Sequence, residues 1–124
     1  MNKLLELQKK IPAILKEETN PFFKSKYFDI NKVIEVLKPI LNELNLILIQ
    51  PLTYIDNGVE TKPALRTCLI DAETNKKILE DVTLLPANPK PQEQGKNITY
   101  FRRYSLTSML LLQGEEDTDG NINK

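Results

Sequence analysis

The chain has 124 residues, 40% hydrophobic and 27% charged, which is enough for one globular domain with a modest core and too short for two. Its 17 basic and 17 acidic residues give no net charge, so composition alone does not indicate a nucleic-acid partner. The absence of histidine removes the commonest general base and metal ligand, and the single cysteine, Cys68, excludes an internal disulfide. The sequence has neither an apolar run long enough to span a membrane nor a signal-peptide pattern.

The N-terminal third predicts two helices separated by a loop. Apolar residues on one face predict a helix over 3–17, kinked or restarted at Pro12. The segment 19–28 lacks a helical period and opens on a turn signal, so we expect an ordered loop there. A strong amphipathic pattern then predicts a second helix over about 30–44, with Asp29 as its N-cap.

The middle of the chain predicts an antiparallel sheet. A β-prone run begins at Leu46 and extends to about Ile55, and Asp56-Asn57-Gly58 is a hairpin turn signal in which two successive residues can adopt positive φ. Two further strands are expected over 63–71 and 77–85. Short turns between consecutive strands favour a three-stranded antiparallel meander.

A long helix is expected to follow the sheet, over about 94–112, with Gly114 as its stop. Its second half is almost entirely apolar and should dock on the sheet or on a neighbouring subunit. The fold class is therefore α+β, with two N-terminal helices, the meander and the long helix. We expect a core domain over 1–113 and an acidic C-terminal segment over 114–124, frayed from residue 115 onward.

The residues do not favour catalysis. No glycine-rich phosphate loop is present, and a lone, buried-looking cysteine cannot form a nucleophile–base pair. Four carboxylates cluster around the second turn of the sheet, where a solvated surface is the favoured interpretation: Asp71, Glu73, Glu80 and Asp81. The acidic run Glu115-x-Asp117-x-Asp119-Gly120 opens like a calcium loop, but the glutamate that would complete it falls beyond Lys124. We therefore expect no enzyme activity, no cofactor and no metal site.

The long helix carries the strongest functional signal. Its candidate nucleic-acid-binding residues are Lys96, Thr99, Tyr100, Arg102, Arg103 and Tyr104. Arg102 and Arg103 lie about 100° apart around a helix and cover a wide arc, while Tyr100 and Tyr104 share one stripe beside Arg103. Backbone amides at 94–97 could receive a phosphate at the helix start. On spacing alone, arginines in surface ion pairs with tyrosines lining the core are an equal alternative.

The loop before the second helix shifts that balance. Half of the aromatic residues fall within 22–28, interleaved with two lysines, and this pattern suits a protein that stacks bases and contacts phosphates. Its candidate binding residues are Lys24, Lys26 and Tyr27. The alternative is a hydrophobic plug with exposed lysines. We expect both, with phenylalanines buried and the lysines facing outward.

The two segments together resemble a known family. The motifs are Asn20-Pro21-Phe22-Phe23-Lys24-Ser25-Lys26-Tyr27, Gly95-Lys96-Asn97-Ile98-Thr99-Tyr100-Phe101-Arg102-Arg103-Tyr104 and Gly114-Glu115-Glu116-Asp117-x-Asp119-Gly120-Asn121. In this order they are similar to the ERF (essential recombination function) family of phage single-strand annealing proteins. Phe101 stands where that family usually has a small alanine, so local packing is expected to differ.

The resemblance implies a β-β-β-α core and ATP-independent annealing of complementary single strands by a homo-oligomer, often a ring. It also implies a groove for the DNA backbone lined by five cations: Lys24, Lys26, Lys96, Arg102 and Arg103. Family members generally continue into a variable C-terminal tail. A host single-strand-binding protein is a further expected partner, through a tail that we expect to be missing here.

We therefore predict a single-stranded DNA-binding protein that anneals strands during phage recombination in the cytoplasm of the bacterial host. The alternative is an oligomeric scaffold that binds a protein partner through the apolar helix end and Phe22/Phe23, without direct DNA binding. A metal-dependent nuclease using the tail acids ranks last.

Overall fold

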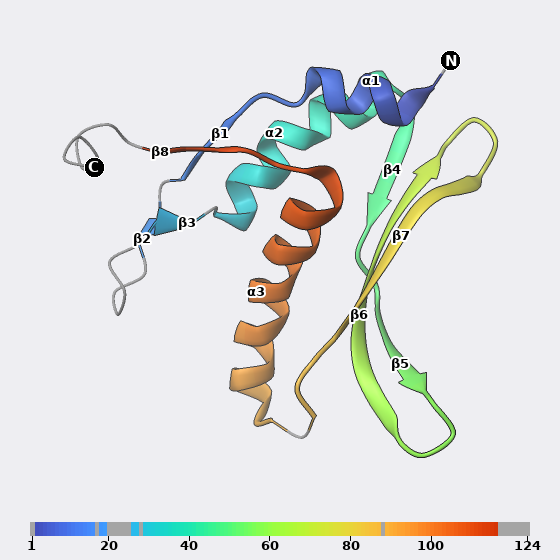
Figure 1. Cartoon of the computed structure of the whole chain (residues 1–124), viewed down its shortest axis with the longest axis vertical. Coiled ribbons are helices and arrows are strands. Elements are labelled where there is room, and N and C mark those ends of the chain that lie inside the picture. The colour runs from blue at the N-terminus through green and yellow to red at the C-terminus, as the bar shows by residue number, and fades with distance from the viewer. Residues whose placement is uncertain (1, 17, 20–25, 28, 88, 117–124) are drawn as a thin grey trace.

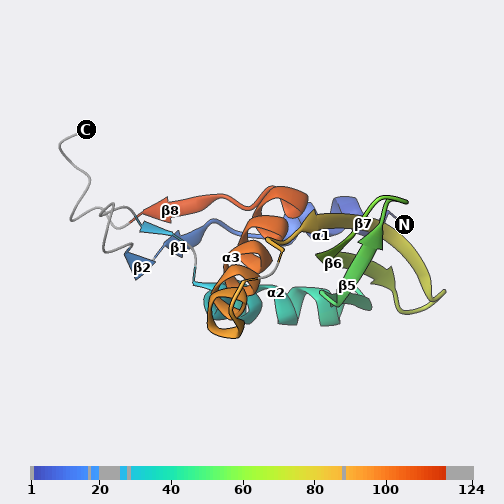
Figure 2. The same ribbon diagram turned by 90° about the horizontal axis from the view of Figure 1, so that it is seen from below.

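The computed structural model describes residues 2–16, 18–19, 26–27, 29–87 and 89–116. Within these ranges the chain forms three helices, a four-stranded antiparallel sheet and two short strand pairs, which confirms the α+β class. The helices lie on one side of the sheet, and the short strand pairs lie beyond the helices, away from the sheet (Figures 1 and 2). No helix in the described part of the chain is long and apolar enough to cross a membrane.

The helices are α1 (Lys3–Lys10), α2 (Ile30–Glu43) and α3 (Pro91–Leu110). The main sheet consists of β4 (Leu46–Ile49), β5 (Leu52–Asp56), β6 (Thr61–Asp71) and β7 (Lys76–Leu84). The short strands are β1 (Ile14–Lys16), β2 (Glu18–Thr19), β3 (Lys26–Tyr27) and β8 (Gly114–Glu116).

The central strand β6 pairs with β7 on one side and with both β4 and β5 on the other. The two pairings on the shared side keep one continuous register, since Ile49 lies opposite Cys68 and Leu52 lies opposite Leu65. Between them, the Arg66 N–H donates to the carbonyl of Pro51 at 2.9 Å, so the ladder runs through the break. The sheet thus follows the predicted meander, with the first strand divided in two.

The hairpin between β5 and β6 forms at the predicted turn. The Asn57 N–H donates to the Glu60 carbonyl at 3.2 Å, and the Asn57 side chain accepts from two later amides of the turn. Only Gly58, at φ 89°, has a positive φ there, so the expected pair of such residues is not found. One glycine is enough because the Asn57 side chain closes the turn.

Helix α1 is shorter than predicted. It ends at Lys10, two residues before Pro12, because a proline disfavours helical geometry in the residue that precedes it. Residues Ile14–Lys16 instead form β1, which pairs in parallel with β8. The expected helix over residues 11–16 is therefore wrong, as is the expected fraying at residues 115 and 116. The proposed division at residue 113/114 stays a prediction.

Helix α2 confirms its prediction closely. The side chain of Asp29 accepts a hydrogen bond from the Asn31 N–H at 3.1 Å, as expected of an N-cap. The apolar stripe of the helix is buried through Ile30, Val33 and Leu37, so the sequence period corresponds to the packed face.

Helix α3 begins and ends earlier than expected. It starts at Pro91, a residue suited to the first turn because it lacks the N–H that would be unpaired there. It stops after Leu110, where Leu111 adopts left-handed geometry at φ 54°. The predicted stop at Gly114 is wrong, and an exposed leucine takes the backbone position that usually favours glycine.

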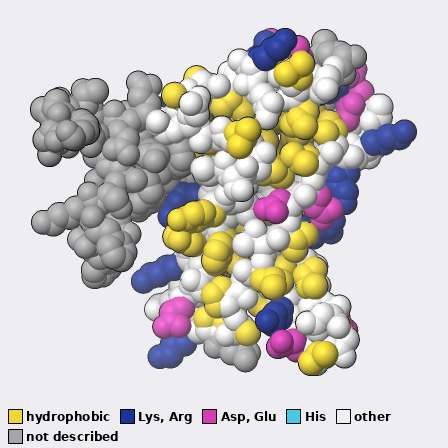
Figure 3. All heavy atoms as spheres, viewed as in Figure 1, with side chains coloured by type: hydrophobic (Ala, Val, Ile, Leu, Met, Phe, Trp, Pro, Cys, Tyr) yellow, Lys and Arg dark blue, Asp and Glu magenta, His cyan; other side chains and the backbone are white. Residues whose placement is uncertain are grey.

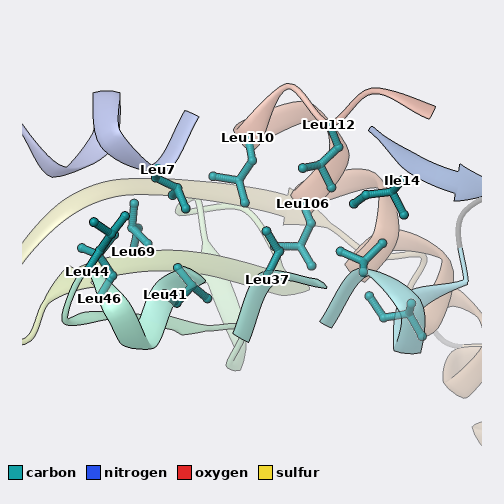
Figure 4. Packing of buried hydrophobic residues seen from close by; sticks show 12 residues of the cluster. Leu7, Ile14, Leu37, Leu41, Leu44, Leu46, Leu69, Leu106, Leu110 and Leu112 are labelled. Atoms are coloured by element: carbon teal, nitrogen blue, oxygen red, sulfur yellow. The ribbon is translucent and has the colours of Figure 1, made fainter. Parts of the chain in front are cut away.

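The core lies between the helices and the sheet (Figure 4). Its buried cluster is Leu7, Ile14, Ile30, Val33, Leu37, Leu41, Leu44, Leu46, Leu69, Leu106, Leu110 and Leu112. The apolar end of α3 therefore packs within its own chain, on the sheet as expected, and Leu106 is only 1% exposed. That burial removes Leu106, Leu110 and Leu112 from the surface that the scaffold alternative requires, whereas Leu111 stays exposed.

Candidate nucleic-acid interface

One face of α3 brings together most of the residues predicted from the sequence. Lys96, Thr99, Tyr100 and Arg103 line a shallow depression of about 510 Å³, together with Gln92 and Gly95. In the view of Figure 3, Lys and Arg side chains project from the side of the molecule where α3 lies, next to hydrophobic side chains. The helix therefore presents cations and apolar groups on one open surface.

The aromatic side chains of this face form a contiguous group. The rings of Tyr100 and Tyr104 lie 4.5 Å apart between centroids and are tilted by 48°. Phe101 contacts Tyr100 edge-to-face at 5.1 Å. The two tyrosines are 43% and 55% exposed, so the alternative in which they line the core is wrong. Their exposure leaves ring surface on which a base could stack.

The two cations of this face, Arg103 and Lys96, differ in their contacts. The Arg103 guanidinium carbon lies 5.7 Å from the centre of the Tyr100 ring, within the range of a cation–π contact. No carboxylate in the described part of the chain comes within ion-pairing distance of Lys96. Lys96 therefore offers a positive charge that no described group neutralises.

Tyr100 adds no negative charge to this face. Hydrogen bonding with the Tyr104 hydroxyl raises the pKa of the Tyr100 phenol above its usual value of 10.0, and partial burial acts in the same direction. Tyr100 is therefore a neutral phenol near pH 7. A neutral hydroxyl can donate to a phosphate oxygen, whereas a phenolate would repel it.

Arg102, adjacent in sequence to Arg103, lies on a different side of α3. It lines a separate groove between α2, β4–β5 and α3, together with Lys38 and Gln50. The Gln50 amide donates to the Arg102 carbonyl at 3.3 Å and to the Thr67 hydroxyl at 3.1 Å, which ties the break in the edge strand to the helix. The structure thus places on different surfaces two arginines for which the family resemblance implies a single groove.

The loop segment expected to contribute cations to the DNA groove is only partly described. Lys26 and Tyr27 form β3, which pairs antiparallel with β2, but their side chains are outside the description. Lys24 and the phenylalanines of 22–28 lie outside the described residues altogether. The contribution of this segment to the groove stays a prediction.

The predicted phosphate site at the amides of 94–97 is wrong. Because α3 begins at Pro91, these residues lie inside the helix, and the Gln94 N–H donates to the Lys90 carbonyl at 2.8 Å. Sequence reasoning missed Gln92 in the depression because it began the helix at about residue 94, after this residue. The proline at the helix start was the available signal.

Three of the four acidic residues considered for catalysis around the second turn of the sheet are engaged in ion pairs. Asp71 and Glu73 both accept from Lys3, the former at 2.8 Å. Glu80 pairs with Arg66 and Lys77, and these two hydrogen bonds, Arg66 foremost, lower the pKa of Glu80 to about 2. Among the described residues, no group of acids or cysteine is arranged to hold a metal ion. The acidic run beyond Glu116 lies outside the description.

Comparison with known proteins places the chain in a family. Searches among curated proteins and among solved structures found no match. A family model described as the ERF superfamily matches residues 1–124. Because this match spans the whole chain, the protein belongs to the ERF superfamily, and membership implies a role in phage recombination through single-strand annealing.

Proposed function

We propose that the protein binds single-stranded DNA and anneals complementary strands without ATP and without catalysis, in the cytoplasm of a bacterial host. The observation that carries the proposal is the depression on α3, where Lys96, Arg103 and the Tyr100–Tyr104 pair lie on one open face. Cations beside exposed aromatic rings supply both contacts that a sequence-tolerant strand binder needs. Family membership supports the same function.

The spacing along α3 suits a nucleic-acid backbone. Lys96 and Arg103 are seven residues apart, a rise of about 10 Å along a helix. If the bound strand keeps the stacked, duplex-like rise of about 3.4 Å per nucleotide along its axis, that length spans about three nucleotides. Phosphates held at both cations would place an intervening base near Tyr100, leaving the edges of the other bases open for pairing.

We also propose that the protein forms a homo-oligomer, consistent with the ring expected from the family. Successive side chains of β6 point to opposite faces of the sheet, and Arg66 and Cys68 lie on the face turned away from the helices. The residues opposite them on the neighbouring strands lie on the same face. Apolar residues on that face are 38–51% exposed: Ile47, Ile49, Ile55, Val82 and Leu84. An uncovered row of this kind is typical of a protein contact surface.

Strand annealing without nucleotide tests the function directly. Two complementary oligonucleotides, one with a fluorophore and one with a quencher, should pair faster with the wild-type protein than alone. The variant Lys96→Gln/Arg103→Gln should lose most of that acceleration. The control Lys9→Gln/Lys76→Gln removes the same charge from exposed positions on α1 and β7 and should retain it.

Two results would count against the proposal. If the Lys96→Gln/Arg103→Gln variant anneals strands as fast as wild type, this face of α3 is not the strand-binding site. Shortened oligonucleotides on a denaturing gel after incubation with Mg²⁺ would show cleavage and would favour the nuclease alternative.

A further inference from the structure

A second surface, distinct from the depression on α3, has the properties of a binding groove. It is a cavity of about 420 Å³ between α2, the broken edge strand β4–β5 and α3, within the size range of small-ligand sites. Its lining is mostly aliphatic, including Ile34, Leu48, Leu52 and Ile98. Leu52 is 58% exposed, so a large apolar side chain lies uncovered at this groove.

Two cations complete the lining of the groove. Lys38 comes from α2 and Arg102 from α3, so the positive charges stand on two different elements. In the described ranges, neither side chain has a carboxylate within ion-pairing distance. The groove therefore pairs an apolar floor with two positive charges that no described acid neutralises.

A hydrogen bond from the sheet fixes the backbone of Arg102. The Gln50 amide bridges the Arg102 carbonyl and the buried Thr67 hydroxyl at the groove, and the Thr83 and Ser105 hydroxyls share a hydrogen bond of 2.9 Å between β7 and α3. Both contacts join α3 to the sheet. Arg102 is therefore presented by a backbone that is anchored at its own carbonyl, which lowers the ordering cost of binding a ligand there.

We propose that this groove binds a protein segment in which apolar side chains are flanked by carboxylates. Aliphatic walls accept leucine- or isoleucine-like side chains, and the Lys38 and Arg102 charges complement acids on either side of them. Among the described residues that line the groove there is no aromatic ring, so this part of the groove offers no stacking surface for a single strand. That surface lies on the other face of α3, at Tyr100 and Tyr104.

Fluorescence polarisation with a labelled probe tests the proposal. The probe is a short synthetic peptide of alternating aspartate and leucine, and the reference probe carries lysine in place of aspartate. The wild-type chain should bind the acidic probe and not the basic one. Substituting Lys38→Gln/Arg102→Gln should weaken binding of the acidic probe about tenfold, and Leu52→Ser should weaken it as well, while Lys9→Gln/Lys76→Gln should leave it unchanged.

The affinity for a single-stranded oligonucleotide, measured on the same variants, separates this inference from the proposed function. Lys38→Gln, at an exposed side chain, should keep oligonucleotide binding within about twofold of wild type. The inference fails if the acidic probe does not bind, or binds Lys38→Gln/Arg102→Gln as well as wild type. It also fails if Lys38→Gln loses oligonucleotide affinity as strongly as Lys96→Gln does, since the groove would then hold nucleic acid. If the wild-type protein does not anneal strands but still binds the acidic probe, the proposed function fails and this inference holds.

Discussion

The salt dependence of strand binding gives the most direct measure of the α3 face. If Lys96 and Arg103 each contact a phosphate, the variant Lys96→Gln/Arg103→Gln should bind single-stranded DNA with a shallower dependence on salt. Each phosphate contact contributes about 0.7 to the slope of log affinity against log salt for a single strand, so the slope should fall by about 1.4. Between 50 and 200 mM salt this corresponds to about 2.6-fold in affinity for each contact.

The assay is fluorescence polarisation of a labelled oligonucleotide at four or more salt concentrations, with the slope fitted for each protein. Lys9→Gln/Lys76→Gln is the matched control, because it removes the same net charge from exposed side chains elsewhere. A long-range effect of net charge would lower both slopes alike. An unchanged slope in Lys96→Gln/Arg103→Gln, or an equal fall in the control, would refute local phosphate contacts at this face.

Three further expectations concern stacking, acid stability and assembly. Tyr100→Leu/Tyr104→Leu should weaken oligonucleotide binding by about 1–3 kcal/mol for each stacked base, with the salt slope unchanged in the same titration. Because Arg66 and a neighbouring lysine lower the pKa of Glu80 from 4.5 to about 2, its ion pairs stabilise the fold above pH 4.5 and lose that effect as the pH falls towards 2. Thermal melts of Glu80→Gln should accordingly change less with pH across that window than those of wild type, and parallel curves would contradict this role. Ile49→Lys, on the outward face of the sheet, should reduce the mass measured by light scattering while leaving the melting curve cooperative; an unchanged mass would exclude that face from the oligomer contact.

Local signals predicted the elements whose ends are set by neighbouring residues. Helix α2 begins where Asp29 can cap it, and the hairpin forms where Gly58 can adopt a positive φ. The antiparallel pairing of β6 with β5 and β7 could be predicted because apolar residues alternate along the strands and short turns connect them. In each case the physical cause lies within a few residues of the feature, so a single sequence contains it.

The missed features depend on contacts between distant residues. Residues Ile14–Lys16 form a strand because Gly114–Glu116 lie beside them, about a hundred positions along the chain. The end of α3 at Leu111 is another example, because the residues that follow it are held by distant partners: Leu112 is buried in the core, and the Gln113 carbonyl accepts from the Ile14 N–H at 2.9 Å. No periodic pattern encodes either outcome.

The separation of Arg102 from Arg103 changes how the site should be tested. Adjacent residues on a helix project about 100° apart, and here that angle is enough to place the two side chains on different surfaces. A double substitution of both arginines would therefore disturb the strand-binding face and the aliphatic groove at once, and a loss of annealing could not be assigned to either. Single substitutions resolve this. Arg103→Gln should affect strand binding alone, and Arg102→Gln should affect capture of the acidic peptide, so the helix would connect a DNA surface to a protein surface through one rigid element.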